Sequence, residues 1–355
     1  MVAQRKNGSL RRKGEEILRA RGEEPMVIVM VDGGLCSAIT KYVLGECFRK
    51  NFGMVVKYDL MWFETNGMDC CNKSSRLFTL TTLFPNIKMD AATQDEIDFY
   101  KRHFYYNNPK PYWYDPAIFD HPQPLYFDGY AEHWKYVAYV EDKVLSELRF
   151  KDLELNEANR DVLSDIHKAP ISIAVHVRRG DYVSIGMAML GEDYYITAIE
   201  QIVSASDQDK AKVFFFSDDI DWVRSHLAPK LPPQIEWRCI DVNNTEAGHL
   251  DLLLISECDH QVSSNSSFGY WGGLLNDNDN KTVIIPMRWL PGQTRGPELA
   301  GCDTAHDYPG FQKLENVPGA KEVRPFNEAL HSRKGHGVPQ SETGVMAGAA
   351  RRKHP

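Results

Sequence analysis

Residues 171–186, ISIAVHVRRGDYVSIG, join an apolar run directly to a cluster of charged side chains. The β-branched residues of the run recur at every second position, at Ile171, Ile173, Val175 and Val177. This alternation is typical of a β-strand, and Gly180 with Asp181 supplies the turn-forming residues that end one. The sequence therefore predicts that Arg178 and Arg179 lie at the carboxyl end of a strand.

Paired arginines at this position have two explanations. In an open α/β sheet the carboxyl ends of the strands form the ligand-binding edge, and a guanidinium offers a bidentate fork of donors to a phosphate. Alternatively, Arg178 or Arg179 forms a structural ion pair with Asp181, because ion-pair networks also gather at strand ends. These sixteen residues leave both explanations open.

The length and composition of the chain limit what it can be. Its 355 residues exceed the size at which one hydrophobic core stops growing, so two domains of about 150 residues each are expected. The content of 43% hydrophobic and 25% charged residues is that of a soluble globular protein. A formal net charge of -8 argues against nucleic acid as the main partner, so any phosphate site must be a local basic pocket.

The sequence shows no feature typical of a membrane span, a disulfide framework or a metal site. The seven cysteines show no C-x-x-C spacing, so we expect reduced thiols and no zinc or other metal. The sequence contains no run of about 18 apolar residues and no hydrophobic segment near the amino terminus. We therefore expect neither a membrane anchor nor a secretion signal. We therefore expect a cytoplasmic protein, with at most a weak membrane-surface contact through its basic termini.

The first half of the chain begins with a charged arm over residues 1–25, expected to be a frayed helix or disordered. A strand follows over Met26 to Val31, then a turn at Gly33 and Gly34, and then a helix. The next strand begins at Met54, in MVVKYDLMWF, which is the βαβ spacing of a parallel sheet. Residues 26–168 are thus predicted to be a Rossmann-like domain.

Residues 100–136 are rich in aromatic side chains and contain five prolines, so they cannot form one regular helix. Aromatic rings stack on the C–H faces of sugars, but they also fill hydrophobic cores. Core packing is the commoner role for any single residue. Tyr126 and Tyr130 are the candidates for contact with a sugar acceptor.

The second half alternates strands and helices after a helical bridge near 135–166. The predicted elements are a strand from Ile171, a helix at 193–204, a strand at 212–219, a helix at 221–227, a strand at 235–240, a helix at 248–257, a strand at 260–264 and a helix from Ser266. Residues 169–328 are predicted to be a second Rossmann-like domain, and 329–355 a disordered basic tail.

Polar residues follow three strands of this second domain, at 176–181, 217–219 and 263–267. Carboxyl ends of parallel strands open on one crevice, so these segments are expected to lie together. The third segment opens a helix, whose hydroxyls and free backbone N–H groups suit an anion, although plain N-capping is the favoured explanation of the serines taken alone. Arginines, acidic tips and a helix amino terminus together fit a nucleoside diphosphate.

The sequence also resembles a known family. HVRRGDY at 176–182, VFFFSDDIDWV at 213–223 and LDLLLISECDHQVSSNSSFGYWGGLLN at 250–276 are similar to motifs of the α-1,2-fucosyltransferases of glycosyltransferase family 11. YDLMWF, YFDGYAEHWKYV and VIIPMRWL also match, and the resemblance covers about residues 26–290. It implies a GT-B fold of two doubly wound Rossmann-like domains, GDP-fucose as donor substrate, inversion at the anomeric carbon, no cofactor and no divalent metal.

The resemblance also implies roles for individual residues. Arg178 would hold the β-phosphate, in place of a metal, and a β-galactoside-terminated glycan would be the acceptor. Further donor contacts are expected from both domains, at Gly33, Gly34, His176, Arg179, Ser217, Asp218, Asp219, Asn265, Ser266, Ser267 and Phe268. His176 and Asp219 would face the guanine or ribose, and Ser266 and Ser267 would hold phosphate.

One turn departs from the family pattern. Where the family has glycine, asparagine and glutamine after the first strand, this chain has Cys36, Ser37 and Ala38. The departure puts donor geometry, acceptor geometry or activity in doubt. An inverting transfer also needs a base, for which Asp181 is the nearest carboxylate in the motif and Asp32 a weaker candidate.

Two other functions remain open. Asp219 and Asp221 form a D-x-D pattern, which in metal-dependent GT-A glycosyltransferases binds a divalent cation through the nucleotide. The loss of the asparagine at Ser37 instead suggests a catalytically weak or silent protein that binds a sugar nucleotide or a glycan. The first alternative predicts inhibition by EDTA, and the second predicts GDP binding without turnover.

Overall fold

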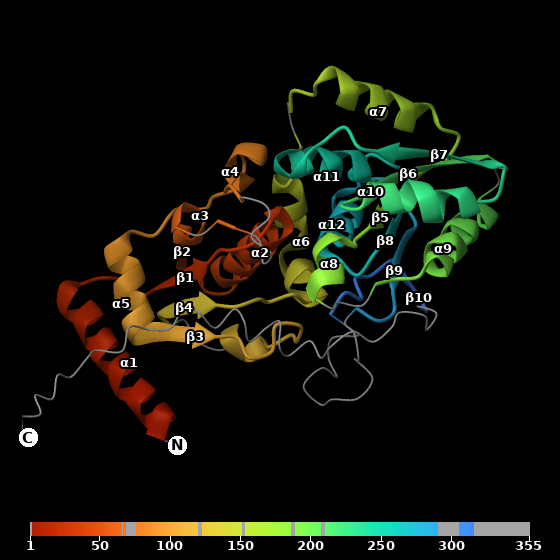
Figure 1. The fold of residues 1–355 in the computed structure, drawn as a ribbon. Helices are drawn as coiled ribbons and strands as arrows, with labels where there is room; N and C mark the ends of the chain where they lie inside the picture. Colours follow the sequence, from red (N-terminus) through yellow and green to blue (C-terminus); the bar gives the residue numbers. More distant parts are fainter. Residues whose placement is uncertain are drawn as a thin grey trace, which may run out of the picture.

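The computed structural model describes residues 2–65, 67–68, 76–119, 123–150, 153–185, 189–206, 210–289 and 305–315. Within these ranges the chain forms two α/β units, each built on a parallel sheet (Figure 1). The prediction of two Rossmann-like units is confirmed. The predicted basic tail at 329–355 lies outside the described residues.

The N-terminal unit has a sheet of strand order β2-β1-β4-β3, with every neighbouring pair parallel. Its strands are β1 (Met26–Met30), β2 (Val55–Asp59), β3 (Tyr105–Asn107) and β4 (Leu125–Asp128). Its helices are α1 (Val2–Arg21), α2 (Leu35–Phe52), α3 (Met61–Thr65), α4 (Leu80–Leu83), α5 (Gln94–Phe104), the 3-10 turn η1 (Pro116–Phe119) and α6 (Trp134–Glu147). The chain reverses direction across the sheet between β1 and β4.

Alternating side chains of β1 explain why helices cover both faces of this sheet. Val27 and Val29 pack in the cluster that holds α2 and α6, whereas Ile28 packs with α1 and α5 on the opposite face. Successive side chains of a strand point to opposite faces, so a strand covered on both sides must be apolar throughout. The run MVIVM meets that requirement.

The amino-terminal segment differs from the prediction of a frayed or disordered arm. Residues 2–21 form α1, which lies along α5 at the outer end of the unit (Figure 1). Leu18 is 4% exposed and packs with Ile97, Tyr100 and Phe104. The apolar residues of this helix are few, but they bury against α5, and this packing holds the helix on the sheet.

The C-terminal unit has a sheet of strand order β10-β9-β8-β5-β6-β7, again with parallel neighbours. Its strands are β5 (Ser172–Val177), β6 (Ala211–Ser217), β7 (Ile235–Ile240), β8 (His260–Ser263), β9 (Val283–Pro286) and β10 (Phe311–Leu314). Its helices are α7 (Glu157–Lys168), α8 (Gly180–Ile185), α9 (Glu192–Ser204), α10 (Ile220–Trp222) with the π-turn Val223–Leu227, two 3-10 turns at Ala228–Lys230 and Thr245–Ala247, α11 (Gly248–Ser256) and α12 (Ser267–Leu275).

The strand order of the second unit has the Rossmann pattern. The chain adds β6 and β7 on one side of β5 and then returns to place β8, β9 and β10 on the other side. The reversal lies between β5 and β8, which pair in register with His176 opposite Ser263. Open α/β sheets bind ligands at this kind of switch point.

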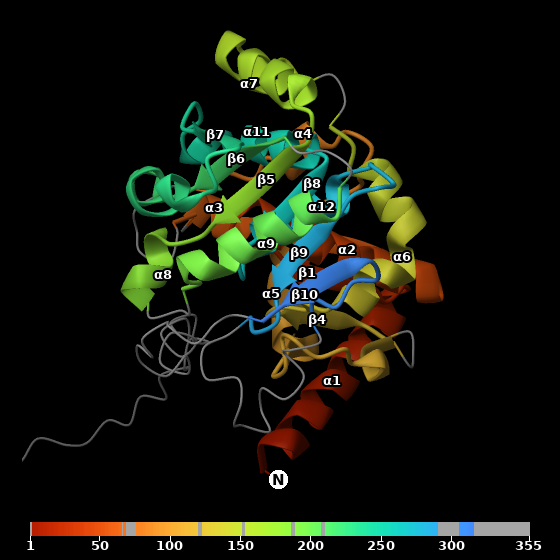
Figure 2. The same ribbon diagram turned by 90° about the vertical axis from the view of Figure 1, so that its right-hand side faces the viewer.

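The domain boundary predicted at 168/169 lies too late in the chain. In α7, Val162 and Ile166 pack with Phe214 of the second sheet, and Asp165 pairs with Lys212. Figure 2 and Figure 1 both show this helix beside α11 and β7. Residues 157–168 therefore belong to the C-terminal unit, because their apolar stripe packs on its sheet.

Three further elements differ from the sequence prediction. In MVVKYDLMWF only Val55–Asp59 is strand, because the chain turns into α3 at Met61. The helix expected near 135–166 is two helices, α6 and α7, which pack on different units. The strand β10 was not predicted, since the hydrophobic pattern weakens after Gln293, yet Phe311–Leu314 pairs with Val283–Pro286.

The two units meet where α2 contacts α12. Trp271 is 2% exposed and its Nε1 donates to Thr40 Oγ1 at 3.3 Å. The segment that precedes β10 also reaches the first unit, because Trp134 N donates to Ala305 O at 2.7 Å. The same hydrophobic cluster holds residues of both units, so the first sheet and α12 share one core.

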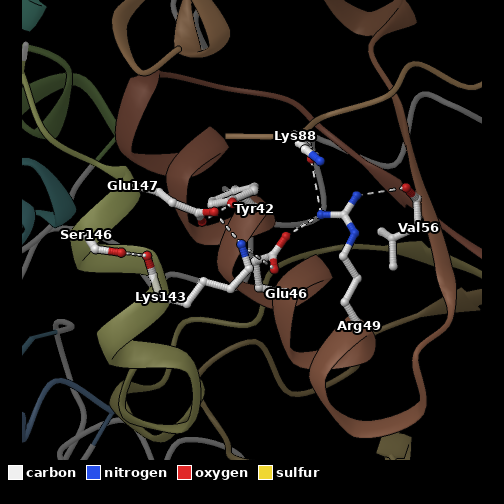
Figure 3. Close-up of polar contacts among 8 residues, drawn as sticks. All are labelled: Tyr42, Glu46, Arg49, Val56, Lys88, Lys143, Ser146 and Glu147. Atoms are coloured by element: carbon white, nitrogen blue, oxygen red, sulfur yellow. Dashed lines mark hydrogen bonds and ion pairs between the residues drawn. The ribbon is translucent and has the colours of Figure 1, made fainter. Parts of the chain in front are cut away.

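A buried ionic network joins α2 to α6 (Figure 3). Glu46 is 2% exposed and pairs with Arg49 of its own helix and with Lys143 of α6, whose Nζ lies 3.3 Å from Glu46 Oε2. Lys143 also pairs with Glu147, which accepts a hydrogen bond of 2.5 Å from Tyr42. The buried charge of Glu46 is thus compensated by two cations, and Lys143 connects α2 to α6.

Candidate active site at the switch point of the second sheet

Three polar segments meet at the carboxyl edge of β5, β6 and β8, as predicted. β5 lies between the other two strands, with Val177 opposite Ser217 and His176 opposite Ser263. Adjacent parallel strands end at the same edge, so the residues that follow them are neighbours. The switch point between β5 and β8 lies inside this group.

Arg178 is held between two carboxylates. Its Nη2 lies 2.8 Å from Asp181 Oδ1 and its Nη1 lies 3.1 Å from Asp218 Oδ2. Burial lowers the pKa of this guanidinium, but the charges of Asp218 and Asp181 outweigh that effect and the pKa is raised. Arg178 therefore remains charged, and the predicted structural ion pair exists. A guanidinium has five N–H donors, so two carboxylate contacts do not exhaust it.

Arg179 is fixed by Asp218 and Asp219, the two acidic residues that follow β6. Its backbone N–H donates to Asp218 Oδ1 at 2.8 Å, and its Nε donates to Asp219 Oδ2 at 3.0 Å. Its guanidinium carbon lies 3.9 Å from the ring centroid of Trp222, which is a cation–π geometry. Two arginines and three aspartates thus form one ion-pair network at the sheet edge.

Asp219 also caps a short helix. Its Oδ1 accepts from the backbone N–H of Trp222 at 3.3 Å, and its own N–H donates to Ser217 Oγ at 3.0 Å. The capping role is therefore present together with the ion pair to Arg179. Ser217, Asp218 and Asp219 shape the loop after β6, and Ser217 supports that loop through its hydroxyl.

Gly180 brings this loop close to Arg178. A Cβ at Gly180 would lie 2.5 Å from Asp218 Oδ2, so any larger residue would displace the carboxylate. The glycine was predicted as a turn residue, and its further role as a point of close approach depends on the pairing of β5 with β6. Sequence spacing alone does not contain that information.

His176 is buried at the switch point. It is 7% exposed, its Nδ1 lies 3.0 Å from Ser264 Oγ, and its backbone carbonyl accepts from Ser264 N–H at 3.0 Å. Burial, and then the charge of Arg178, lowers its pKa from 6.5 to about 3. The imidazole is therefore neutral at pH 7, with its ring 5.3 Å from that of Phe268.

The segment after β8 leads into α12. Ser266 is the N-cap and accepts from Phe268 N–H at 3.3 Å, so the capping role predicted for the serines is present. Asn265 is completely buried and donates to the carbonyl of Trp289 at 2.8 Å, which connects this segment to the segment that follows β9. Ser267 opens the helix and lines a small cavity between the units.

That cavity has a volume of about 20 Å³, space for one water molecule. Thr40 and Glu132 of the first unit line it together with Ser267 and Tyr270 of the second. Burial and then the charge of Glu132 raise the pKa of Cys36. Burial also raises the pKa of Tyr182, and Glu132 adds to that rise. The charge of Glu132 thus acts on residues of both units, Cys36 of α2 and Tyr182 of α8.

Tyr182 is a site residue to which the sequence analysis gave no role. Its OH donates to the carbonyl of Asn265 at 2.8 Å, and its ring centroid lies 5.5 Å from the guanidinium carbon of Arg178. It therefore connects the segment after β5 to the segment after β8. The sequence could have pointed to Tyr182 through its position in HVRRGDY, because every other polar residue of that motif was assigned a role at the site.

The glycine turn of the first unit lies at the equivalent switch point, between β1 and β4. Gly33 has a φ of 81°, which favours glycine, and Gly34 is the N-cap of α2 without a side-chain cap. Tyr130, which follows β4, donates from its OH to Asp32 Oδ2 at 3.4 Å. Tyr130, the predicted acceptor contact, therefore lies beside the turn that holds the predicted donor contacts Gly33 and Gly34.

Tyr126 is not at that edge. It is 0% exposed on β4, it packs in the cluster with α1 and α5, and its OH donates to Asp59 Oδ2 at 2.5 Å. The prediction that Tyr126 contacts an acceptor is therefore wrong. A side chain facing α5 inside the fold cannot reach a sugar. The core-packing role, which the aromatic content of residues 100–136 left open, is the observed one.

The described residues contain no group of three or more His, Cys, Asp or Glu side chains placed to hold a metal ion. The two carboxylates of the D-x-D pattern are held by different arginines. Asp219 pairs with Arg179, whereas Asp221 is 91% exposed and pairs with Arg224 at 2.8 Å. Within the part of the chain that is described, no helix is both long and apolar enough to cross a membrane.

The geometry defines a two-unit α/β protein of GT-B architecture, with a charged edge at the switch point of its second sheet. Its sequence matches the family described as "Glycosyl transferase family 11" over residues 83–293, more than half of the chain. The chain therefore belongs to glycosyl transferase family 11.

Curated relatives match over parts of their length. The chain is 31% identical over 170 residues to an alpha-1,2-colitosyltransferase of Escherichia coli, covering 46% of this chain and 56% of the relative. It is 29% identical over 154 residues to the O-antigen biosynthesis glycosyltransferase WbnK of Escherichia coli, covering 40% and 49%. A galactoside alpha-(1,2)-fucosyltransferase 1 of Bos taurus is 24% identical over 178 residues, covering 47% of each.

The chain thus spans about half the length of the curated relatives it matches. Among solved structures, the fucosyltransferase NodZ from Bradyrhizobium is 13% identical with a TM-score of 0.43, and the comparison covers 71% of this chain and 93% of that one.

Proposed function

We propose that this chain is an inverting glycosyltransferase that moves L-fucose from GDP-fucose to the 2-hydroxyl of a terminal β-galactoside without a divalent metal. The observation that carries the proposal is the convergence of HVRRGDY, SDD and SSNSS at the switch point of the second sheet in a family 11 protein. That edge is where Rossmann-type sheets bind nucleotides.

Arg178 is the residue to which we assign the leaving diphosphate. Asp181 and Asp218 hold its guanidinium in one orientation before any ligand arrives, and two carboxylate contacts leave further N–H donors for a phosphate. Charge that develops on the β-phosphate as the glycosidic bond breaks is stabilised best by such a preoriented cation. This charge stabilisation replaces the role that a metal has in GT-A enzymes.

The nucleoside is assigned to the neighbouring residues. His176 is neutral and can only donate or accept a hydrogen bond, which suits an uncharged guanine or ribose more than a phosphate. Asp219 offers carboxylate oxygens to the same groups. Ser266 and Ser267 lie at the amino terminus of α12, where partial positive charge and N–H groups favour a phosphate.

The donor and acceptor assignments rest on the relatives. The names of the curated relatives include alpha-1,2-colitosyl and galactoside alpha-(1,2)-fucosyl transfer. Fucose is chosen as the transferred sugar because the motifs resemble those of α-1,2-fucosyltransferases. A cytoplasmic location stays a prediction.

The test is GDP release in the presence of GDP-fucose and a panel of β-galactosides, with the matching colitosyl nucleotide as a second donor. We expect release that depends on acceptor, survives EDTA, and gives a 1→2 linkage by NMR. GDP should raise the melting temperature more than UDP does, because the guanine contacts are the proposed source of specificity. Equal stabilisation by UDP and GDP would contradict the nucleotide assignment.

A catalytically silent binding protein is the second candidate, and two observations favour it. Ser37 replaces the family asparagine, and both arginines of the motif are already paired with carboxylates. This candidate predicts that GDP binds while no acceptor in the panel stimulates its release. A D-x-D metal enzyme is disfavoured, since Asp219 and Asp221 pair with different arginines.

A further inference from the structure

Four groups converge at the glycine turn of the first unit. Tyr130 OH lies 3.4 Å from Asp32 Oδ2. A Cβ built on Gly33 would lie 3.2 Å from Ser37 Oγ and 3.8 Å from Tyr130 OH. Asp32, Ser37 and Tyr130 thus lie around Gly33, which has no side chain to occupy the space beside them.

Two polar atoms of this group are unpaired. Asp32 Oδ1 and Ser37 Oγ are buried and have no hydrogen-bond partner among the described residues. Leaving a buried polar atom unsatisfied costs about 1 to 3 kcal/mol, so such atoms often belong to a ligand site. A carboxylate oxygen accepts a hydrogen bond, whereas a serine hydroxyl both donates and accepts. An alcohol, which needs one acceptor and one donor, fits the pair.

The turn faces the second unit. Ser37 precedes Thr40 by one helical turn on α2, and Thr40 accepts the hydrogen bond from Trp271 of α12. Glu132, two residues after Tyr130, lines the cavity between the units together with Ser267. An alcohol held by Asp32 and Ser37 would therefore be on the side of the first unit that faces α12.

We propose that Asp32 and Ser37 hold the reacting hydroxyl of the acceptor sugar, and that Asp32 takes its proton. The inference rests on the proposed function. As the acceptor oxygen forms its bond to the anomeric carbon, the bond from that carbon to the β-phosphate oxygen breaks and its electron pair leaves with GDP. The hydroxyl proton passes to the carboxylate of Asp32, and Ser37 donates to the same oxygen in the bound state.

Asp181, the carboxylate nearest in the motif, is less suited to this role. Its Oδ1 pairs with Arg178 at 2.8 Å, so this carboxylate is already engaged in orienting the guanidinium. Glu132 is the remaining competitor, since it also faces the space between the units. The experiment must therefore separate Asp32 from Glu132.

The first measurement is kcat for the wild type, Asp32→Asn and Glu132→Gln, with GDP-fucose and the best acceptor of the panel. Asp32→Asn keeps the shape but removes the base, so kcat should fall by about 100- to 10,000-fold and the acidic limb of its pH profile should disappear. Its GDP affinity and melting temperature should stay near those of the wild type. Asp277→Asn, a 74% exposed carboxylate paired with Arg149, is the control with unchanged kcat.

The second measurement is acceptor binding, with methyl β-D-galactoside in the presence of GDP, followed by ligand-observed NMR. Ser37→Ala should weaken binding and raise the acceptor KM about tenfold, with a smaller change in kcat. If the wild type and Asp32→Asn are equally active, the inference is wrong while the proposed function stands. The same holds if the acidic limb disappears only in Glu132→Gln. A wild type that neither transfers fucose nor binds the galactoside overturns the inference together with the proposed function.

Discussion

Arg178 is joined to Asp218 across the boundary of two neighbouring strands, with Nη1 of the arginine 3.1 Å from Oδ2 of the aspartate. The first residue follows β5 and the second follows β6, so the pairing of these strands sets the contact. Asp181, three residues after Arg178, pairs with the other terminal nitrogen of the guanidinium, Nη2. The guanidinium is thus oriented by the sheet before a ligand binds.

This relationship predicts how substitutions of Arg178 will behave. Arg178→Lys keeps the charge but loses the planar fork, and Arg178→Ala loses both. We expect Arg178→Ala to lower kcat by about 100- to 1,000-fold, equivalent to about 3 to 4 kcal/mol of barrier. A moderate fall in melting temperature should accompany it, because Asp181 and Asp218 lose their shared partner. Both quantities are measured on the same preparation.

Arg224 is the matched control for Arg178. It also pairs with two aspartates, Asp221 at 2.8 Å and Asp241 at 2.7 Å, but it lies on the outer surface. Arg224→Ala should leave kcat unchanged. If Arg178→Ala lowers the melting temperature while the folded enzyme keeps near-normal kcat, the arginine is structural and its catalytic assignment is wrong.

Asp219→Asn separates nucleotide binding from helix capping. The amide oxygen can still accept from Trp222 N–H, so the cap survives, whereas the charge facing Arg179 is lost. We expect GDP binding, measured by calorimetry, to weaken about tenfold with little change in melting temperature. Asp221→Asn should leave GDP affinity unaltered, with or without manganese. Unchanged GDP binding by Asp219→Asn would leave this residue as a cap alone.

Much of the site could be predicted because strand ends are visible in sequence. The apolar runs before His176, Ser217 and Ser263 indicated buried strands, and parallel strands bring their carboxyl ends to one edge. The strand order then placed the three segments together. What the sequence could not contain was which aspartate faces which arginine, since that depends on register and on the close approach at Gly180.

The errors have a common physical cause. Tyr126 was assigned to an acceptor because tyrosines can stack on sugars, but on β4 it faces α5 and is completely buried. Residues 157–168 were placed in the first domain because they follow α6 in sequence, yet their apolar stripe packs on the second sheet. In both cases the residue type was compatible with two environments, and the tertiary contacts decided between them.

Glu46 provides a test of the packing between α2 and α6. It is 2% exposed and pairs with Lys143 and Arg49, so Glu46→Ala leaves two cations without their shared carboxylate. We expect the free energy of unfolding to fall by about 1.5 to 3 kcal/mol in urea titrations, because Lys143 and Arg49 are partly exposed and Lys143 keeps Glu147 as a partner. Asp277→Ala, which breaks the exposed pair to Arg149, should cost at most about 1 kcal/mol. Equal losses would show that the buried network contributes no more than a surface pair.

His306 makes stability depend on pH at the junction of the two units. It is 6% exposed, its ring stacks on Trp289 at 3.5 Å between centroids, and burial, followed by the charges of His133 and Lys313, lowers its pKa from 6.5 to about 3. Below pH 6.5 the unfolded chain therefore binds a proton that the folded chain does not. The contribution of this residue is complete above pH 6.5 and is lost as the pH falls toward 3.

His306→Asn removes that titration, so the variant should lose less stability than the wild type between pH 7 and pH 5. One proton contributes about 1.4 kcal/mol per pH unit, which gives a difference of about 2 kcal/mol in the change of unfolding free energy over this range. Asp251, whose burial raises its pKa to about 6, acts with the opposite sign, but it is common to both proteins and cancels. Urea titrations at the two pH values measure the difference, and parallel losses in the two proteins would mean that His306 is protonated in the folded state.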